Sequence, residues 1–417
     1  MRGLCVFEDG GHTGLLPLAY SRASYELRLG MYTLLERSLR YYPNTTISLF
    51  ARESLTDVLK ERYPYYINTL DPEADGYLFI NGRTLNPEPI PLEGEDEIGV
   101  FKDTLVYARL SKKNYQDVSP DSFASTELLK KLKKKSSKVR EVEVRLIDYS
   151  WDIMKSNREE LEKDFSILHE KGQILGKVYE GVHILNPKWV FLGKGARVKP
   201  GCVLDAEESP IYVGEDVTIM PNATIIGPAF IDKGTVVLPA ARLREGSNIG
   251  VGCKVGGEIS NSILHSYSSK QHDGFLGDSY IGSWVNLGAG TTTSNLKNTY
   301  GSIKAKLTRN KKLVDTKEVF LGAAIGDHTK VGINTSFDAG SLIGCHSSIA
   351  GRKPVPKFLP SFSWLTDQGL KVYNMRKAFI AATRAMARRN VHMSAAEEAM
   401  FRNIFAVTTL ERKGMRK

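Results

Sequence analysis

The sequence of 417 residues contains few cysteines and no long apolar run, and each absence excludes a class of protein. Its four cysteines are scattered without a Cys-x-x-Cys pair, which indicates neither a disulfide framework nor a zinc site. No stretch reaches the roughly 18 uninterrupted apolar residues of a membrane span, and the first residues lack the apolar core of a signal peptide. We therefore expect a cytoplasmic protein with no membrane span and with reduced, mostly buried thiols at Cys5, Cys202, Cys253 and Cys345.

An even spread of positive charge is also lacking, although the formal net charge is +10. The excess lies in two blocks, one at 130–140 and one at 376–389. Neither block is interleaved with aromatic residues as a base-stacking surface would be. We therefore expect no nucleic-acid partner, and we interpret the blocks as solvated surface or as a rim that attracts phosphate.

Short apolar runs alternate with helix-like segments over the first 150 residues. They lie at 4–7, 31–39, 46–50, 54–60, 77–80, 97–101 and 143–147. This alternation predicts an α/β domain with a largely parallel sheet. After it, Leu161, Phe165 and Leu168 are spaced by four and three residues, which predicts a connecting helix over 153–171.

Aliphatic residues then recur at every sixth position, which is the strongest pattern in the sequence. They are Val213, Ile219, Ile225, Ile231, Val237, Leu243, Ile249 and Val255. A period of six fits neither an α-helix nor a plain strand, but it fits a solenoid with three flat faces per coil. The same spacing occurs before this run and after it, at Leu192, Val198 and Leu204 and at Val319, Ile325, Val331, Phe337, Ile343 and Ile349. We therefore predict a left-handed parallel β-helix of hexapeptide repeats.

The repeat is interrupted at 205–212 and at about 296–318, and such interruptions map to loops where binding residues concentrate. The second interruption contains Lys304, Lys306, Arg309, Lys311 and Lys312. A helical period returns over 365–405, and this segment would cap the solenoid. We divide the chain into an α/β domain at 1–152, a linker helix at 153–173, a β-helix at 174–355 and a helical tail at 356–417.

Two segments inside the solenoid, 270–278 and 285–295, do not read as structural filler. The first contains His272, and a histidine ionises close to neutral pH, so it suits a general base that takes a proton from an amine or a hydroxyl. The second offers small residues whose backbone N–H groups can approach an acyl oxygen, with amide side chains at Asn286 and Asn295 to orient a substrate. Taken alone, His272 also suits a merely structural role, because the chain has eight histidines.

The segment 270–295 resembles the acetyltransferase centre of the GlmU-like bifunctional family, which joins glucosamine-1-phosphate N-acetyltransferase to N-acetylglucosamine-1-phosphate uridyltransferase. The family motif recurs as His272, Phe-Leu-Gly-Asp at 275–278, Ile-Gly at 281–282, Asn-Leu-Gly-Ala-Gly-Thr at 286–291 and Asn295. The resemblance implies that His272 is the general base, that Asn286 and Asn295 position the amino sugar, and that the Ala289 backbone binds the oxyanion. It also implies acetyl-CoA as the donor and a homotrimer with active sites between subunits.

One departure concerns the phosphate of the acceptor sugar. Where the bacterial enzymes have a lysine for this phosphate, twelve residues before the histidine, this chain has Ser260. We expect Ser260 beside the substrate and the phosphate on Lys270 or on the lysines of the second interruption.

The N-terminal domain resembles the sugar-1-phosphate nucleotidyltransferases. Residues 9–18 (DGGHTGLLPL) follow their signature Gly-x-Gly-Thr-Arg-[Leu/Met]-x-Pro-Leu, so the triphosphate would lie against Gly10, Gly11 and Thr13. Residues 77–83 follow a strand that ends in Asn-Gly-Asp, whose aspartate binds magnesium in the family. This resemblance adds Asn81 and Gly82 to the expected nucleotide site.

Several family positions of this domain carry other residues. Gly14 stands where the family has an arginine, Arg83 where it has the magnesium-binding aspartate, and Ser24 where it has a lysine. Arg22 and Arg28 lie nearby, and we expect them to bind the nucleotide instead. Asp152 is the candidate Mg²⁺ ligand.

The first interpretation is therefore a transferase of amino-sugar nucleotide biosynthesis. It would transfer an acetyl group from acetyl-CoA to a sugar 1-phosphate in the β-helix, and in a Rossmann-like N-terminal domain it would transfer uridylyl from UTP with Mg²⁺. The second is a monofunctional acyltransferase whose N-terminal domain only binds a sugar nucleotide. The third is a non-catalytic assembly or regulatory subunit.

Overall fold

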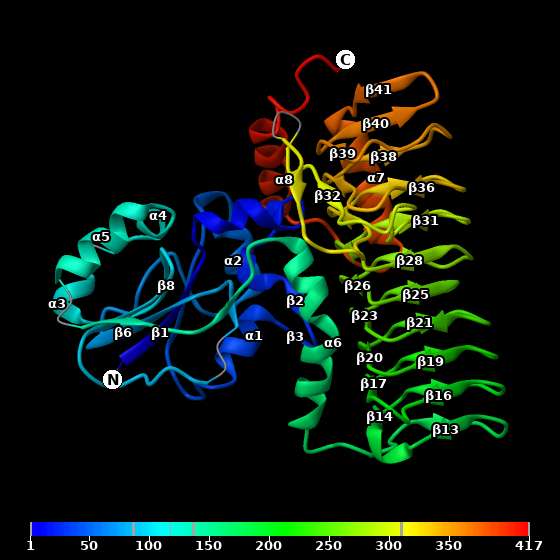
Figure 1. Cartoon of the computed structure of the whole chain (residues 1–417), viewed down its shortest axis with the longest axis horizontal. Coiled ribbons are helices and arrows are strands. Elements are labelled where there is room, and N and C mark those ends of the chain that lie inside the picture. The colour runs from blue at the N-terminus through cyan, green and yellow to red at the C-terminus, as the bar shows by residue number, and fades with distance from the viewer. Residues whose placement is uncertain (1, 86–87, 117, 136–137, 309–311, 416–417) are drawn as a thin grey trace. The chain divides into compact units, whose positions relative to one another are not determined.

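The computed structural model describes residues 2–85, 88–116, 118–135, 138–308 and 312–415, which form two compact units (Figure 1). The N-terminal unit consists of Met1–Leu27, Tyr32–Tyr149 and Ala395–Asn403. The β-helix unit consists of Arg28–Met31, Ser150–Ser394 and Ile404–Lys417. The short segment Arg28–Met31 thus groups with the second half of the chain.

A seven-stranded sheet with the order β10-β8-β9-β6-β1-β4-β5 forms the core of the N-terminal unit. Its strands are β1 (Arg2–Phe7), β4 (Ile47–Phe50), β5 (Tyr66–Ile67), β6 (Gly76–Asn81), β8 (Glu97–Phe101), β9 (Thr104–Ser111) and β10 (Val139–Glu141). Strands β5, β4, β1 and β6 are parallel, and β9 is antiparallel to β6 and β8. Because β1 and β6 are buried on both faces, they read as near-continuous apolar runs. The predicted α/β domain is confirmed.

Short helices complete this unit. They are α1 (Leu34–Leu39), α2 (Thr56–Arg62), α3 (Lys112–Tyr115), α4 (Pro120–Phe123) and α5 (Thr126–Lys135). The Phe123 ring of α4 stacks on the Phe7 ring of β1 with 4.0 Å between centroids. Strand β3 (Tyr32–Thr33) precedes α1, and β7 (Thr84–Leu85) pairs with β11 (Arg145–Leu146).

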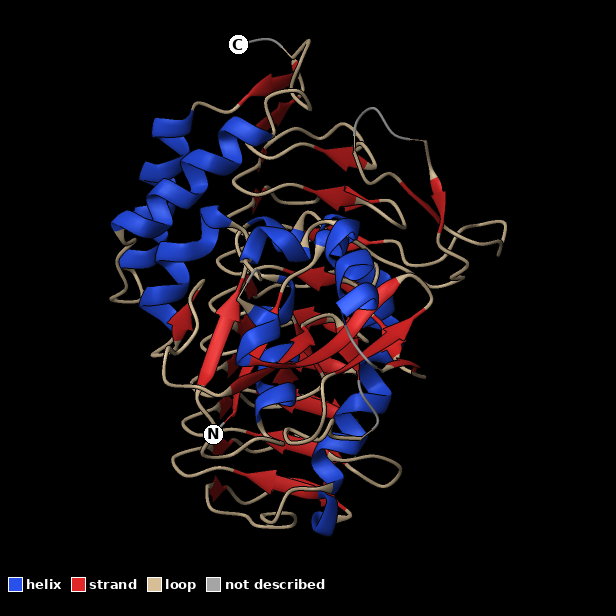
Figure 2. Cartoon of the chain, turned by 90° about the vertical axis from the view of Figure 1, so that its left-hand side faces the viewer, coloured by secondary structure: helices blue, strands red, loops and turns tan. Residues whose placement is uncertain are grey.

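The β-helix unit stacks coils, which Figure 2 shows as layers of short strands. These strands form three sheets. The first sheet contains β12 (Lys177–Val178), β15 (Arg197–Val198), β18 (Thr218–Ile219), β21 (Val236–Val237), β24 (Lys254–Val255), β27 (Ser269–Lys270), β30 (Asn286–Leu287), β35 (Lys330–Val331), β38 (Ser348–Ile349), β40 (Ser363–Thr366) and β41 (Gly369–Val372). The second contains β13 (His183–Leu185), β16 (Val203–Asp205), β19 (Thr224–Ile226), β22 (Arg242–Leu243), β25 (Glu258–Ser260) and β28 (Phe275–Gly277). The third contains β14 (Val190–Leu192), β17 (Ile211–Val213), β20 (Ala229–Ile231), β23 (Ser247–Ile249), β26 (Ile263–Leu264), β29 (Tyr280–Ile281), β34 (Ala324–Ile325), β37 (Leu342–Ile343) and β39 (Phe358–Leu359).

The six-residue period predicted the interior of these coils. All eight aliphatic residues from Val213 to Val255 are fully buried and belong to one core cluster. Each strand is paired with a strand of the next coil in parallel register, as in Ile219 opposite Val237 and Val237 opposite Val255. Stacked coils therefore bury one continuous apolar column, and the predicted left-handed β-helix is confirmed.

The second interruption is a hairpin that leaves the coil. Within it, β32 (Lys304–Ala305) pairs antiparallel with β33 (Val314–Asp315). The placement of Val319 in the interior was wrong, because Val319 directly follows this hairpin and is 40% exposed, whereas Ile325 is fully buried. Strand β31 (Thr292–Thr293) precedes the hairpin and pairs with β36 (Ser336–Phe337), which follows it. The stacking of coils therefore continues past the insertion.

Helix α6 (Ser150–Ser166) differs from the predicted linker, since it starts earlier, ends earlier and belongs to the β-helix unit. Asn157 on α6 donates to the Gly246 carbonyl at 2.8 Å and accepts from Asn248 Nδ2 at 2.9 Å. Asn248 Nδ2 also donates to the Gly30 carbonyl at 2.6 Å, next to strand β2 (Arg28–Leu29). These buried polar contacts explain why the segment Arg28–Met31 groups with the β-helix unit.

The helical tail consists of α7 (Met375–Ala387) and α8 (Ala395–Val407), which confirms the predicted helical end of the chain. The helical pattern was wrong for its first part, because β40 and β41 form an antiparallel hairpin there. None of the helices in the described part of the chain is long and apolar enough to cross a membrane.

A ladder of stacked rings follows one corner of successive coils. Its members are Tyr267, Trp284, His328, His346 and Phe362. Each has a backbone φ between 51° and 63°, the left-handed conformation that turns the corner. The His328 and His346 rings stack at 4.7 Å, and Phe379 of α7 meets the His346 ring edge-on at 5.6 Å. The ladder therefore links the corner of the coils to the tail helix.

Acid is expected to destabilise this ladder through His346. Burial, reinforced by the nearby His328 and Lys330, holds the pKa of His346 well below its ordinary value, while Asp327 opposes the shift. The unfolded chain therefore binds a proton that the folded chain does not, and stability is lost as the pH falls below the unfolded value of about 6.5. We expect a loss of up to about 2 kcal/mol at pH 5, measured as the Tm of the protein between pH 5 and 8.

The matched variants are His346→Phe and His183→Phe. The first should flatten the pH dependence because a phenyl ring fills the same place in the stack without titrating. The second removes an exposed histidine and should leave the dependence unchanged. An unchanged acid dependence in His346→Phe would show that another group controls it.

Candidate active site

His272 lies on the surface in the loop between β27 and β28. This loop rests against the turn at 289–291 of the next coil, because the Gly290 N–H donates to the Asp273 carbonyl at 3.0 Å. Gly274 has φ +124°, and a Cβ there would lie 2.1 Å from the Thr291 carbonyl oxygen, so the two segments touch backbone to backbone. The predicted base and the predicted oxyanion turn at Ala289 therefore lie in adjacent coils.

Asn286 opens strand β30, directly before this turn. Its side chain is exposed, and its register partners in the adjacent coils are Ser269 and Lys330. The Ala289 carbonyl accepts from the Asn334 N–H at 2.7 Å, which holds the turn from the coil on its other side. Asn286 and Ala289 are thus held within one rigid coil.

The other predicted residues gather at the far end of β28, around Asp278. The Asp278 carboxylate accepts from Asn295 Nδ2 at 2.7 Å and from Asn261 Nδ2 at 2.6 Å. Ser260 is buried beside them, and its carbonyl accepts from the Asp278 N–H at 3.1 Å. Strand β28 separates the His272 loop from the group around Asp278. Because a strand rises about 3.3 Å per residue, its three residues span roughly the length of a sugar ring with one substituent.

Phe275 lies between the two clusters. A Cβ on Gly277 would lie 2.5 Å from the Phe275 ring and 2.9 Å from Asn295 Nδ2, so only glycine leaves room for the ring at this point. The half-buried ring is an apolar surface that joins the His272 loop to the Asn295 end.

The expectation that Lys270 binds phosphate needs correction. Its side chain is 2% exposed and points into the coil, where its ammonium donates to the backbone carbonyls of Gly256 and His272. Of the basic residues in the second interruption, Lys304 is exposed on β32, and Arg309 and Lys311 lie outside the described residues.

Two arginines that sequence reasoning did not single out lie near the His272 loop. Arg242, Glu258 and Phe275 are register partners in one outward row of the second sheet. The Glu258 carboxylate lies 3.7 Å from Arg242 and 3.4 Å from Arg244, and both arginine side chains are about half exposed. The alternating Arg-Leu-Arg at 242–244 is the sequence signal for this pair, because both flank the interior Leu243.

In the N-terminal unit, Arg83 occupies the glycine-rich loop. Its guanidinium donates to Asp9 Oδ1 at 2.6 Å and Oδ2 at 2.8 Å, and to the Ile147 carbonyl and Asp148 at 2.9 and 2.8 Å. A Cβ on Gly11 would lie 2.1 Å from the guanidinium carbon, so this glycine makes room for Arg83. Burial alone would raise the pKa of Asp9, but its contacts with Arg83 hold the pKa below its ordinary value.

These contacts do not fit the Mg²⁺ that the family resemblance implies. Besides Arg83, the Asp9 carboxylate accepts from Asn81 Nδ2 at 2.9 Å and from the Gly11 N–H at 3.1 Å, so its oxygens are already engaged. Asp152, the predicted metal ligand, lies in the first turn of α6 in the β-helix unit. Among the described residues, no group of three or more acidic, histidine or cysteine side chains could hold a metal ion. The Arg83 guanidinium supplies the positive charge next to Asp9.

Beside Arg83 a pocket of about 280 Å³ remains. Gly10, Gly11, Asp103, Thr104 and Ala124 are among the residues that line it. Thr13 is exposed, and its hydroxyl donates to the Gly10 carbonyl at 3.1 Å. Gly82 follows Asn81 at the end of β6, where a Cβ would lie 2.7 Å from Tyr25. Gly10 and Gly11 therefore line this pocket, whereas Thr13 and Gly82 are not among its lining residues.

Arg22 and Arg28 were both predicted to bind nucleotide, but they belong to different units. The buried Arg22 stays in the N-terminal unit, where its carbonyl accepts from Arg52 at 3.2 Å. Arg28 belongs to the β-helix unit, where its guanidinium lies 2.9 Å from Asp232 and 5.1 Å from the Phe230 ring centre. We therefore withdraw Arg28 from the nucleotide site, because these contacts already use its charge.

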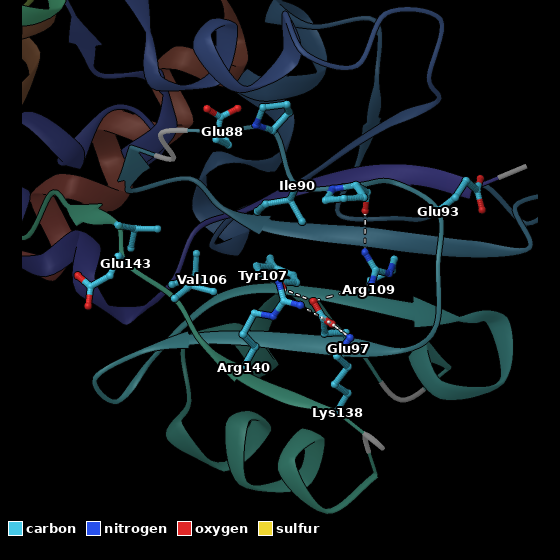
Figure 3. A pocket seen from close by; sticks show the side chains of 14 residues that line it. Glu88, Ile90, Glu93, Glu97, Val106, Tyr107, Arg109, Lys138, Arg140 and Glu143 are labelled. Atoms are coloured by element: carbon cyan, nitrogen blue, oxygen red, sulfur yellow. Dashed lines mark hydrogen bonds and ion pairs between the residues drawn. The ribbon is translucent and has the colours of Figure 1, made fainter.

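A second pocket, of about 380 Å³, lies over β8, β9 and β10 (Figure 3). Glu97 forms its floor and accepts from the Tyr107 hydroxyl and from Lys138 Nζ, the latter at 2.9 Å. Arg109 and Arg140 lie 3.8 and 3.9 Å from the same carboxylate. One buried carboxylate thus holds three cations together and ties the edge strand β10 to its neighbours.

Glu97→Gln is expected to destabilise the N-terminal unit by about 2 kcal/mol, because hydrogen bonds to a charged group are lost and cations are left facing each other. Burial would raise the pKa of Glu97, but its partners hold it below the ordinary value. The carboxylate therefore contributes stability above the unfolded pKa of about 4.3, and this contribution is lost as the pH falls further. Thermal unfolding at pH 7 tests this, with Glu143→Gln on the same pocket's rim as the control. Equal Tm values for the two variants would contradict it.

Comparison with known proteins gives three findings. Residues 4–173 match the family model described as sugar nucleotidyl transferase. The chain is 29% identical over 171 residues to the bifunctional protein GlmU of Cyanothece sp. (strain PCC 7425), a match that covers 40% of this chain and 32% of that protein. It is 38% identical over 128 residues to the bifunctional protein GlmU of Bordetella parapertussis, covering 29% and 24%. The chain thus matches about a third or less of the length of these curated relatives.

Solved structures supply the third finding. The UDP-N-acetylglucosamine acyltransferase from Campylobacter jejuni superposes with a TM-score of 0.30 at 11% identity, covering 57% of this chain and 86% of that one.

Proposed function

We propose that the chain is a divergent member of the GlmU-like family and a transferase of amino-sugar nucleotide biosynthesis, a proposal supported by the sugar nucleotidyl transferase match over 4–173 and by the partial identity with GlmU. Its β-helix unit transfers an acetyl group from acetyl-CoA to the amine of a sugar 1-phosphate similar to glucosamine 1-phosphate. The observation that supports this most is the contact between the His272 loop and the turn at 289–291. Acyl transfer requires a base close to a backbone donor, and this contact supports both roles in one site.

The chain's own residues divide the chemistry. His272 accepts the proton of the attacking amine, and the Ala289 N–H donates to the acyl oxygen as it gains charge. Asn286 and Asn295 orient the sugar from the two ends of Phe275. Acetyl-CoA supplies the thioester when bound, so that a carbon–nitrogen bond forms, the carbon–sulfur bond breaks and the CoA thiol leaves with a proton.

Arg242 and Arg244 replace the phosphate-binding lysine whose position Ser260 occupies. Arg242 opens strand β22 and Arg244 directly follows it. Arg242 pairs in register with Glu258, which pairs with Phe275, and a guanidinium pairs well with a phosphate. A homotrimer, as in the family, would complete the site from a second subunit, and sedimentation equilibrium measures this.

For the N-terminal unit we propose binding of a sugar nucleotide without magnesium, which makes the β-helix unit the active half. Arg83 supports this over uridylyl transfer, because its charge already neutralises Asp9. Two alternatives remain. In the first, the N-terminal unit also transfers uridylyl from UTP, and in the second, the protein is a non-catalytic subunit.

Two assays separate these functions. Purified protein with acetyl-CoA and glucosamine 1-phosphate should release CoA thiol, detected with a chromogenic disulfide, and no release would contradict the main proposal. The same protein with UTP, N-acetylglucosamine 1-phosphate and Mg²⁺ should release no pyrophosphate. Pyrophosphate release would show instead that the N-terminal unit is catalytic.

A further inference from the structure

Lys270 is the one charged residue in an otherwise aliphatic column of the first sheet, within the described coils. The residues at the same place in the neighbouring strands are Ile219, Val237, Val255, Leu287, Val331 and Ile349, all at most 4% exposed. Lys270 pairs in register with Val255, so its side chain enters the interior that the others fill with methyl groups. An aliphatic residue would fit this column without burying a charge.

The backbone around the ammonium is shaped to receive it. Lys270 Nζ donates to the His272 carbonyl at 2.6 Å and to the Gly256 carbonyl at 3.2 Å. Gly257 has φ +68°, and a Cβ there would lie 2.9 Å from Nζ and 2.7 Å from the His272 oxygen. The ammonium therefore ties the backbone of His272 to the preceding coil, and glycine leaves the space for it.

This burial is costly. Desolvation lowers the pKa of Lys270 to about 8, with Arg242 lowering it further and Asp273 opposing the shift. Burying a charge costs free energy, and an apolar side chain of similar volume often replaces it without loss of stability, so the hydrogen bonds of this ammonium point to a role other than stability. Here those bonds end on the residue with the predicted base.

We propose that Lys270 is a positioning residue for His272. By holding the His272 carbonyl toward the interior, it fixes the loop at 271–274 so that the imidazole faces the outside of the coil, next to the turn at 289–291. This inference rests on the proposed acetyl transfer. The cation acts through the backbone and touches no substrate.

The test compares Lys270→Met with Lys254→Met. Methionine fills the column at Lys270, and Lys254 is a half-buried lysine in the preceding coil of the same sheet. Lys270→Met should lower kcat by about 10- to 100-fold, since small misplacements of reacting groups have effects of this size, while the KM for acetyl-CoA changes less than about twofold. Lys254→Met should match the wild type in both constants. A filler role would leave the kcat of folded Lys270→Met unchanged, and that result would overturn the proposal.

Hydrogen exchange supplies a readout that needs no activity. In Lys270→Met, the amides of the peptide over 271–278 and the Gly290 amide should exchange at least about tenfold faster, while those at 213–249 stay protected. Unchanged exchange in Lys270→Met would overturn the positioning role, whatever the activity of the wild type. A wild type that releases no CoA would contradict the proposed function but not the positioning role. If Lys270→Met does not fold, Gly257→Ala is the second variant, because its methyl group displaces the ammonium. It should give the same faster local exchange and the same loss of kcat. Exchange and kcat equal to those of the wild type would overturn the proposal.

Discussion

His272→Ala is expected to lower kcat/KM for acetyl transfer by about 10²- to 10⁴-fold, the range that a positioned general base contributes. The side chain is exposed, so its removal leaves no cavity and the Tm should stay within about 1 °C of the wild type. CoA thiol release at saturating acetyl-CoA with varied acceptor measures the effect. Of all substitutions proposed for this chain, this one should change activity most.

His183→Ala is the matched control, because His183 is an exposed histidine in a regular coil far along the same β-helix unit. It should retain full activity. A His272→Ala variant as active as His183→Ala would show that His272 is a surface histidine and that the acceptor amine loses its proton elsewhere. Asn286→Ala would then decide whether the neighbouring turn takes part at all.

Arg83→Ala is expected to cost the N-terminal unit about 3–5 kcal/mol, the range for breaking a buried ion pair. The Arg83 side chain is 3% exposed, and its removal leaves Asp9 as a buried carboxylate without its cation. The space that Gly11 leaves for the guanidinium would also become a cavity. Circular dichroism and calorimetry should show an early transition of this unit, with the β-helix unit melting later and unchanged.

Asp148→Ala is the control, because its carboxylate contacts the same guanidinium but is 53% exposed. It should cost less than about 1 kcal/mol. Since Arg83 lowers the pKa of Asp9, the wild type should lose stability as the pH falls below about 4, and Arg83→Ala should lack this contribution at every pH. If Arg83→Ala and Asp148→Ala melt alike, the guanidinium is not the main stabiliser of the loop.

The sequence by itself determined the features that repeat or that lie within a short segment. The six-residue period required stacked coils, because each coil covers its apolar face only by lying on an identical one. The motif at 270–295 placed His272 and Ala289 in consecutive coils, since the path of a β-helix is set by residue spacing. Alternating apolar runs likewise predicted the α/β unit. These conclusions needed only local order, and they predicted most of the fold and the segments that form the candidate site.

Only the tertiary structure decided which charged side chains form ion pairs or hydrogen bonds, and with which partners. Arg83 meets Asp9 across 74 residues and Arg28 meets Asp232 across 204 residues, so neither pairing is visible in any local pattern. Lys270 was a candidate for the phosphate but occupies an interior column, because one residue of register decides whether a side chain faces the core or the solvent. Hydrophobic periodicity is a sum over many equivalent contacts and survives single exceptions. A charged side chain depends on one partner, and only the folded chain shows which partner that is.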